Sequence, residues 1–416
     1  MSQNKKSLLK AIGPGILFAG AAIGGSHLIQ STRAGADYGY SLLLLVILAN
    51  LFKYPFFEFS YRYTSAKSKS LLEGYRDLGS WALWSFLIIS IVTGVINLAA
   101  LALGASGVLG YIIGLPIQPL YLSIGLVLLC ILILALGKYP LLDKAMKVMI
   151  VMLAICTTIA FVMSLSVDTI PVADFAQPDI FAKSGILFII ALMGWMPAPI
   201  EASVWTSLWS IGRQKQMEYV PTLRESLIDF HIGYVGTTVL AVFFLALGAN
   251  IMHGTGVTFS NNGTEFSKQV IQLYTGLFGK WSAIIIAPAA FFTLFSSLIT
   301  VIDAYPRSIT GAIYLINKKT EAIKMNLYII LMLTMSVIGI LIVSLFVQNL
   351  KAMMDLATVI AFLAAPVFAI INYKIVTATD FPRDFKPKPW LKYLALVGII
   401  FLVGFSLVYL WSLMYL

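Results

Sequence analysis

Residues 13–36 read GPGILFAGAAIGGSHLIQSTRAGA, and this stretch decides the fold. It is apolar and long enough to cross a membrane, because a transmembrane helix needs about 20 predominantly apolar residues. Gly24-Gly25-Ser26-His27 interrupt it near the middle. Lipid cannot hydrogen-bond a loosened backbone, so the interruption indicates that this segment lines a cavity or a bound solute.

A second interruption follows the same logic. An apolar run leads into Met196-Pro197-Ala198-Pro199, and another apolar segment with polar positions comes after it. In secondary transporters, interrupted helices in corresponding positions of two halves mark the substrate site. The two interruptions therefore predict where a solute binds.

The composition is that of an integral membrane protein. Of 416 residues, 60% are hydrophobic and 11% are charged, and the mean hydropathy is +0.92. A soluble domain carries about 25% charged residues. The apolar runs are continuous rather than alternating, which favours helices over a β-barrel and predicts an all-α fold. Cys130 and Cys156 both fall in apolar runs and are expected to be small core residues, not a disulfide or a metal pair.

A window of about 20 residues predicts eleven membrane-spanning segments. They lie near residues 12–34, 39–62, 80–112, 119–137, 142–166, 184–209, 226–252, 280–304, 325–347, 354–375 and 391–415. Interruptions in the first and sixth segments suggest one transporter domain over residues 1–416, with inverted repeats of five helices each (12–166 and 184–375) and an extra helix at 391–415.

The basic residues predict the orientation. They concentrate in alternate connections: Lys5, Lys6 and Lys10; Lys67, Lys69 and Arg76; Lys138, Lys144 and Lys147; Arg213, Lys215 and Arg224; Lys318, Lys319 and Lys324; and Lys374, Arg383, Lys386, Lys388 and Lys392. By the positive-inside rule these connections are cytoplasmic. We expect a plasma (bacterial inner) membrane protein with its N-terminus inside and its C-terminus outside. The net charge of +10 then needs no nucleic-acid partner.

The beginning of the chain resembles a known family. GPGILFAG, the run QSTRAGADYGYSLLLLVILANL, Arg62 and the LEGYR sequence at 72–76 are similar to the start of Nramp-type divalent-metal transporters. The Met-Pro pair in the sixth segment and the spacing of all eleven segments extend the likeness over the whole chain. The resemblance implies the leucine-transporter fold and transport by alternating access, with no enzymatic activity, no catalytic residues and no cofactor.

The family's metal ligands are not matched. Where the family has Asp-Pro-Gly-Asn, this chain has Gly24, Gly25, Ser26 and His27; Met196 matches a family ligand, but Ala198 replaces the histidine beside it. The acidic positions of the third segment align with Leu98 and Leu101, and the ninth segment, 327–347, lacks the family's arginine. A divalent cation needs an anionic ligand to offset its dehydration. We therefore expect no metal site, with Met196 as a ligand if a metal is carried.

Backbone donors suggest a different solute. If the outer half of the first segment starts near Gly25 and a second helix starts after Pro197, two positive helix ends face the cavity. The predicted substrate-binding residues are Gly24, Gly25, Ser26, His27, Met193, Met196, Pro197 and Ala198. Gln30, Ser31, Arg33 and Glu201 are predicted to act in gating or coupling. We expect Glu201 either to pair with Arg33 or Lys53 or to carry a proton.

Coupling to sodium is a further prediction. Ser296, Ser297 and Thr300 supply hydroxyls in the eighth segment, where the leucine-transporter fold can hold a sodium ion against first-helix carbonyls. The alternative is that these side chains only join helices.

The sequence thus predicts a monomeric secondary-active transporter in the lipid bilayer for a small inorganic ion, driven by Na⁺ or H⁺. The first-choice substrate is a small anion such as bicarbonate. A metal cation transporter (Mn, Fe or Mg type) with an altered site is the alternative, and a non-transporting membrane sensor is a third.

Overall fold

The computed structural model describes residues 10–137, 139–168, 172, 175–317 and 321–415. Lys5, Lys6, Lys138, Lys318 and Lys319, used above for the orientation, lie outside these residues. Within the described part, the ordered elements are helices: α2 (Pro14–Ile23), η1 (Gly24–Ser31), α3 (Thr32–Tyr38), α4 (Leu43–Lys67), α5 (Leu71–Leu78), α6 (Ser80–Ile113), α7 (Pro119–Ala135), α8 (Tyr139–Ser164), α9 (Lys183–Gly194), α10 (Ala202–Met217), α11 (Leu223–Ile251), α12 (Gly263–Phe278), η2 (Lys280–Ser282), α13 (Ala283–Asn317), α14 (Glu321–Phe346), α15 (Leu350–Thr377), η3 (Arg383–Phe385) and α16 (Pro389–Tyr415).

Eight helices of the described chain are long and apolar enough to cross a membrane: α4, α6, α8, α11, α13, α14, α15 and α16. The other three predicted segments coincide with the 17-residue α7 and with two composite segments, α2–η1–α3 and α9–α10. Every predicted segment therefore has a helical counterpart, while the number of crossings stays a prediction.

The first interruption differs from the predicted form. Residues Gly24–Ser31 make a π-helix that joins α2 directly to α3, instead of an unwound break. In a π-helix each N–H bonds to the carbonyl five residues earlier. The outer half therefore does not begin with free N–H groups near Gly25, as the sequence had suggested.

The second interruption is a true break. α9 ends at Gly194 and α10 begins at Ala202, with the non-helical residues 195–201 between them. Pro199 consequently lies ahead of α10 rather than in its first turn. The first N–H groups of α10 are also occupied, since Ala202 N and Ser203 N donate to Pro199 O and Ile200 O at 3.0 and 2.9 Å.

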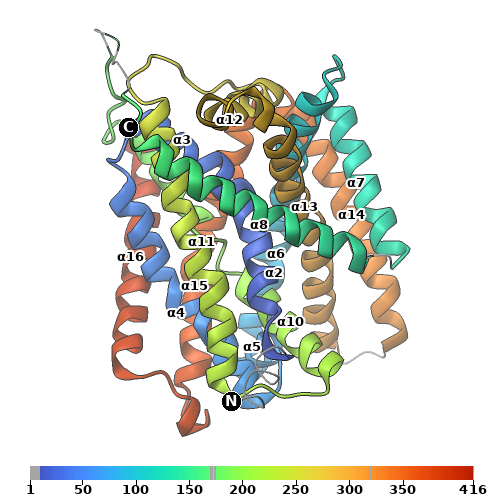
Figure 1. The fold of residues 1–416 in the computed structure, drawn as a ribbon. Coiled ribbons are helices and arrows are strands. Elements are labelled where there is room, and N and C mark those ends of the chain that lie inside the picture. Colours follow the sequence, from blue (N-terminus) through green and yellow to red (C-terminus); the bar gives the residue numbers. More distant parts are fainter. Residues whose placement is uncertain (1–9, 138, 169–171, 173–174, 318–320, 416) are drawn as a thin grey trace, which may run out of the picture.

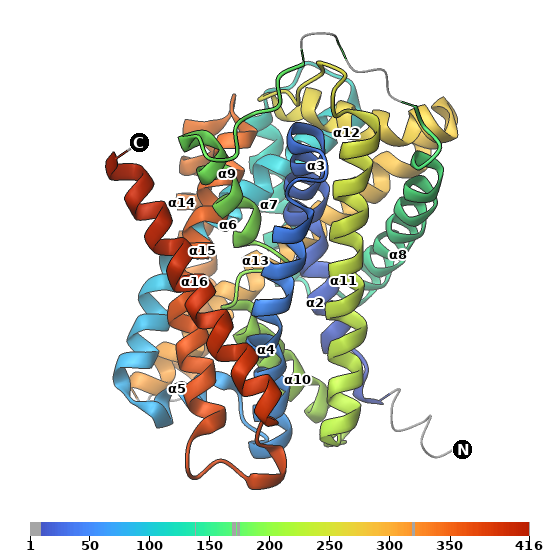
Figure 2. The ribbon, with the colours of Figure 1, turned by 90° about the vertical axis from the view of Figure 1, so that its left-hand side faces the viewer.

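The interrupted segments lie inside the helix bundle. The first segment packs against α11 and α13, α6 packs along α13, and α9 packs along α15. Figures 1 and 2 show α2 and α3 running through the middle of the bundle and α16 lying on its side next to α4 and α15. α2 starts at one end of the bundle and α16 finishes at the other, as expected for an odd number of crossings.

Candidate functional site

A cavity lies where the two interruptions meet. Its free space is about 470 Å³, counting the part that is open to solvent. Gly25 and Ser26 of η1 line it, together with Pro197 and Ala198 of the α9–α10 connection. Four of the eight predicted substrate-binding residues thus lie in one cavity wall.

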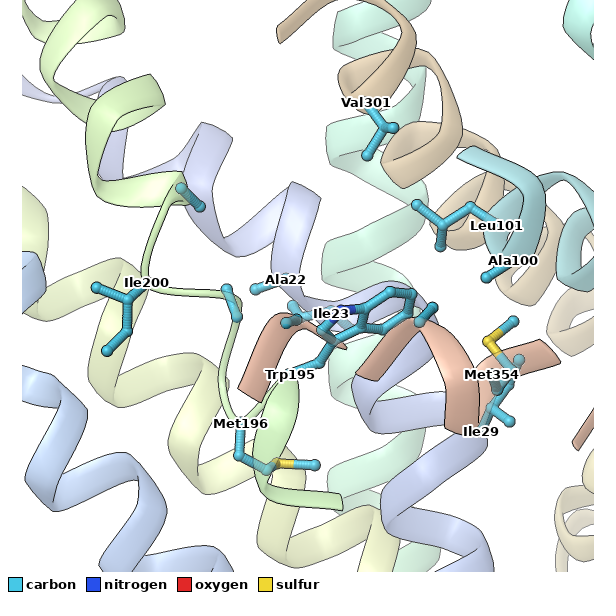
Figure 3. Close-up of a cluster of buried hydrophobic side chains, with 14 of the residues drawn as sticks. Ala22, Ile23, Ile29, Ala100, Leu101, Trp195, Met196, Ile200, Val301 and Met354 are labelled. Carbon is cyan, nitrogen blue, oxygen red and sulfur yellow. The ribbon is translucent and has the colours of Figure 1, made fainter. Parts of the chain in front are cut away.

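Aromatic and amide side chains complete the wall. Trp195, Trp205 and Asn97 line the cavity, and none of them was singled out from the sequence. Figure 3 shows Trp195 extending from the α9–α10 connection toward Leu101 of α6. The indole packs so closely on η1 that a Cβ at Gly25 would lie 2.6 Å from its Cζ3 atom. Gly25 is therefore required as glycine by this contact.

His27 faces away from the cavity. Its Nε2 atom donates to Thr237 O of α11 at 2.8 Å, and its Nδ1 atom lies 2.6 Å from Ser26 Oγ. The ring also packs edge-on against Phe244, at a centroid distance of 6.4 Å. Both ring nitrogens are thus engaged within the protein, and His27 anchors η1 to α11.

The predicted sulfur ligands are also absent from the cavity wall. Met193 and Met196 are fully buried in the core, and the hydroxyl of Ser31 lies 3.9 Å from Met196 Sδ. Gly24 instead packs against Ser297 of α13. No group of three or more His, Cys, Asp or Glu side chains able to hold a metal ion exists among the described residues.

Glu201 lies at the start of α10 and is only 1% exposed. Its carboxylate accepts hydrogen bonds from Thr93 Oγ1 at 2.9 Å and from Tyr305 Oη. Asn97 Nδ2 donates to the same Tyr305 Oη at 2.5 Å, so two hydrogen bonds join the cavity wall to the carboxylate. Of the two predicted alternatives, pairing with Arg33 or Lys53 is not found, because Glu201 has no cationic partner within the described chain. The other alternative, that Glu201 carries a proton, stays a prediction.

Three cavity-lining side chains hold buried polar atoms without a hydrogen-bond partner among the described residues. They are Asn97 Oδ1, Trp195 Nε1 and Trp205 Nε1. Buried polar groups are nearly always hydrogen-bonded, so each such atom needs an explanation, for example a bound solute. Asn97 could have been found from the sequence, because it is a lone amide in an apolar segment. The sequence has no comparable signal for Trp195 and Trp205, since tryptophan is common in membrane segments.

Two of the four predicted gating or coupling residues, Gln30 and Arg33, meet at the other end of the first segment. Arg33 of α3 donates to both carboxylate oxygens of Asp355 on α15, at 2.8 and 3.3 Å. Gln30 donates to Asp355 Oδ1 at 2.9 Å and accepts from Arg33 at the same distance. The guanidinium also lies over the Phe188 ring of α9, 4.8 Å from its centroid. These contacts tie α3 to α9 and α15.

The hydroxyls proposed for sodium lie partly against the first segment. Ser297 Oγ donates to Ala21 O of α2 at 3.0 Å, and Ser296 Oγ lies 3.6 Å from the position of a Cβ on Gly20. Thr300 is half-buried on the same helix. The arrangement brings α13 hydroxyls to α2 carbonyls, and a sodium site there stays a prediction.

A central cavity between two interrupted segments, in a bundle of membrane-length helices, defines the class of secondary transporter-like membrane proteins. Comparison with known families identifies the chain further: the model of natural resistance-associated macrophage protein-like (Nramp) sequences matches residues 15–412. The chain belongs to the Nramp family, whose members are transporters rather than enzymes. The family resemblance seen in the sequence is thereby confirmed.

Individual relatives agree with this assignment. An uncharacterized protein of Pasteurella multocida is 36% identical over 97% of this chain and 92% of its own length. The divalent metal cation transporter MntH of Lacticaseibacillus casei is 23% identical over 97% of this chain and 90% of its own.

Solved structures show the same fold. A mutant of the Eremococcus coleocola manganese transporter matches with a TM-score of 0.73 at 16% identity, over 97% of this chain and 86% of that one. MhsT in complex with L-phenylalanine matches with a TM-score of 0.61 at 14% identity, over 96% and 98% of the two chains. The neighbours have the leucine-transporter fold, as the sequence predicted, while the five-plus-five repeat boundaries stay a prediction.

Proposed function

We propose that this chain is a secondary-active transporter that carries a divalent metal cation through the central cavity by alternating access. The names of the MntH relatives and of the manganese transporter favour metal cargo, which was the alternative in the sequence analysis, over a small anion. One observation in this chain carries the proposal: Glu201 is a buried carboxylate with no cationic partner among the described residues, two hydrogen bonds from the cavity. Such a charge attracts a cation and repels an anion.

The ligands at hand are oxygen atoms. Asn97 Oδ1 and Ser26 Oγ belong to residues that line the cavity. The His27 imidazole and the Met196 thioether instead contact other parts of the protein. Neutral oxygens suit hard cations, and Mg²⁺ in particular keeps several of its waters when bound. We therefore place a partly hydrated Mg²⁺ ahead of Mn²⁺ or Fe²⁺ as cargo.

A small anion such as bicarbonate is the second candidate. The indole N–H groups of Trp195 and Trp205 belong to the cavity wall, have no partner among the described residues and cannot ligate a cation. They are suitable donors for an anion or a polar solute. The predicted pair of helix N-termini does not add to them, since η1 is helical and the first donors of α10 are occupied.

The proposal also covers the coupling ion, the membrane topology and the oligomeric state. Glu201 is the group we assign to proton coupling, and Ser296, Ser297 and Thr300 are the alternative for sodium. The protein is proposed to work as a monomer in a bacterial inner membrane, with its N-terminus in the cytoplasm and its C-terminus outside.

Uptake into proteoliposomes tests the proposal. The purified chain is reconstituted, and entry of Mg²⁺, Mn²⁺ and labelled bicarbonate is measured with imposed Na⁺ or pH gradients. We expect saturable Mg²⁺ uptake and no bicarbonate uptake. Bicarbonate uptake without cation uptake would establish the second candidate, and no uptake of any of the three would contradict both.

Two matched glycine variants test whether the cavity is the route. Gly25→Val forces Trp195 to move, and overpacking of this kind typically costs about 1–3 kcal/mol. Gly125→Val in α7 meets nothing within 4 Å. We expect Gly25→Val to abolish uptake and Gly125→Val to retain it; equal uptake by the two variants would place the route elsewhere.

A further inference from the structure

A lysine side chain is buried inside the second interruption. Lys53 of α4 is 0% exposed, and its Nζ atom donates to Met193 O at 2.7 Å, Gly194 O at 2.7 Å and Ala198 O at 3.4 Å. An ammonium group has three N–H donors and no acceptor, so these three carbonyls match its bonding capacity. No carboxylate of the described chain pairs with it.

The three carbonyls together form a cation site. The last carbonyls of a helix have no intrahelical partner and carry the negative end of its dipole. Met193 and Gly194 are the last residues of α9, and Ala198 follows in the non-helical connection. Met193 O also accepts from Met196 N at 3.2 Å, and its second lone pair remains for the ammonium. Backbone carbonyls at such breaks bind mobile cations in transporters.

We propose that Lys53 is a tethered cation that permanently fills this carbonyl site, so that no mobile cation binds at the end of α9. The cargo is then confined to the side of the cavity lined by η1 and α6. Lys53 also joins both sides of the interruption to α4 and so fixes the distance between α9 and the connection. The occupation of the carbonyl site by Lys53 needs no assumption about the cargo, whereas the location of the cargo rests on the proposed function.

If Lys53 acted only through the packing of its side chain, the variants would behave differently. If only the length of Lys53 matters, an uncharged side chain of similar length replaces it. If its charge matters, a separate cation can replace the side chain. Lys53→Ala removes Cγ, Cδ, Cε and Nζ, which are the heavy atoms of n-propylammonium.

The test is the thermal stability of the purified full-length protein in different salts. Lys53→Ala is compared in n-propylammonium, sodium and tetramethylammonium chloride at equal ionic strength. We expect a saturable rise in Tm with n-propylammonium or sodium and none with tetramethylammonium, because a ligand that binds only the folded state stabilises it. The parent and Lys388→Ala, which changes an exposed lysine, should show no such difference.

Two further results decide the matter. Lys53→Met keeps the length without the charge, and parent-like Tm and uptake in this variant would overturn the proposal. If Lys53→Ala cannot be purified in ordinary buffer, its recovery from membranes extracted in each salt replaces the Tm. Equal recovery or equal Tm in all three salts would also overturn it. Because stability is measured without cargo, failure here is distinguishable from failure of the transport proposal.

Discussion

Two buried charges flank the second interruption, and each matches the helix end beside it. Lys53 lies on the carbonyl end of α9, and Glu201 lies at the amino end of α10. A cation is stabilised at the negative end of a helix dipole and an anion at the positive end. The two charges are not paired with each other, so each is held by polar groups of the protein rather than by a neighbouring ion. The cavity wall is joined to both groups: Ala198 O accepts from Lys53, and Asn97 is connected through Tyr305 to Glu201.

Replacing Glu201 with glutamine tests the electrostatic role of the carboxylate. Glutamine keeps the shape and an acceptor oxygen for Tyr305 but removes the negative charge. At an effective dielectric of about 20, a unit negative charge and a divalent cation about 10 Å apart attract each other by on the order of 3 kcal/mol, or roughly a hundredfold in affinity. We expect Glu201→Gln to lower cation uptake at subsaturating concentration by about that factor, measured in proteoliposomes.

The control for this variant is Glu265→Gln, which neutralises an exposed glutamate of α12 paired with Lys268. It should transport as the parent does. Parent-like uptake by Glu201→Gln, with unchanged pH dependence, would show that Glu201 has neither a cargo-attracting nor a proton-carrying role.

The sequence predicted a coupling role for Glu201, which stays a prediction, but it did not predict the surroundings of the carboxylate. A carboxylate close to an interruption is recognisable because it is costly in an apolar segment. Spacing along the chain does not show which neighbouring helix a side chain faces, so the predicted partners Arg33 and Lys53 were wrong. Asn97 and Tyr305, which connect Glu201 to the cavity, come from α6 and α13 and become neighbours only when the bundle is assembled.

At the scale of elements, side-chain contacts hold the first segment to its neighbours, and two of them involve predicted site residues. His27 bonds η1 to α11, and Arg33 bonds α3 to Asp355 of α15. Between them the π-helix changes the helical pitch, and such irregularities are frequent at functional sites. Movement of α3 relative to α15 therefore requires the Arg33–Asp355 pair to break.

Breaking that pair should open the outer side of the bundle. The Asp355 side chain is 35% exposed, so the pair is expected to contribute only about 1 kcal/mol, or roughly a fivefold shift toward the open form. The measurement uses Thr358→Cys, beneath Asp355, in a chain without Cys130 and Cys156. We expect Asp355→Asn to raise the rate of modification of that cysteine by a membrane-impermeant thiol reagent about fivefold.

Charge exchange provides the matched comparison. Arg33→Asp combined with Asp355→Arg should restore slow modification, whereas Asp77→Asn, in an exposed pair within α5, should leave the rate unchanged. Equal rates in the parent and in Asp355→Asn would show that the pair does not close this side.

The sequence located both interruptions correctly but not their form. Two adjacent glycines and two polar residues show where an apolar helix is weakened. They do not show whether the backbone unwinds or changes its bonding pattern. Contacts from other elements decide this: His27 is held by Thr237 of α11, and Gly25 is covered by Trp195. The proline-containing stretch 195–201 was easier, because proline cannot donate the backbone hydrogen bond that a continuous helix needs.

At the scale of the whole molecule, the chain has the helical framework of the family, and the framework does not determine which side chains line the cavity. The Nramp match over residues 15–412 and the TM-score of 0.73 describe that framework. Fold and function are separable, and function depends on the site residues. In this chain the site offers amide and hydroxyl oxygens, indole N–H groups and one carboxylate behind them, so cargo must be established by transport measurements.

The number of crossings determines on which side the chain ends. Lysine and arginine in alternate connections predict a cytoplasmic N-terminus, and eleven crossings then place the C-terminus outside. The last connection, between α15 and α16, contains Arg383, Lys386 and Lys388, so it should be cytoplasmic.

Fusions to a reporter that fluoresces only in the cytoplasm, and to alkaline phosphatase, which is active only outside, measure both positions in cells. After Leu416 we expect phosphatase activity without fluorescence, and after Lys386 the reverse, because α16 is then missing. Fluorescence at both positions would mean an even number of crossings in the full chain and would contradict the eleven-segment topology.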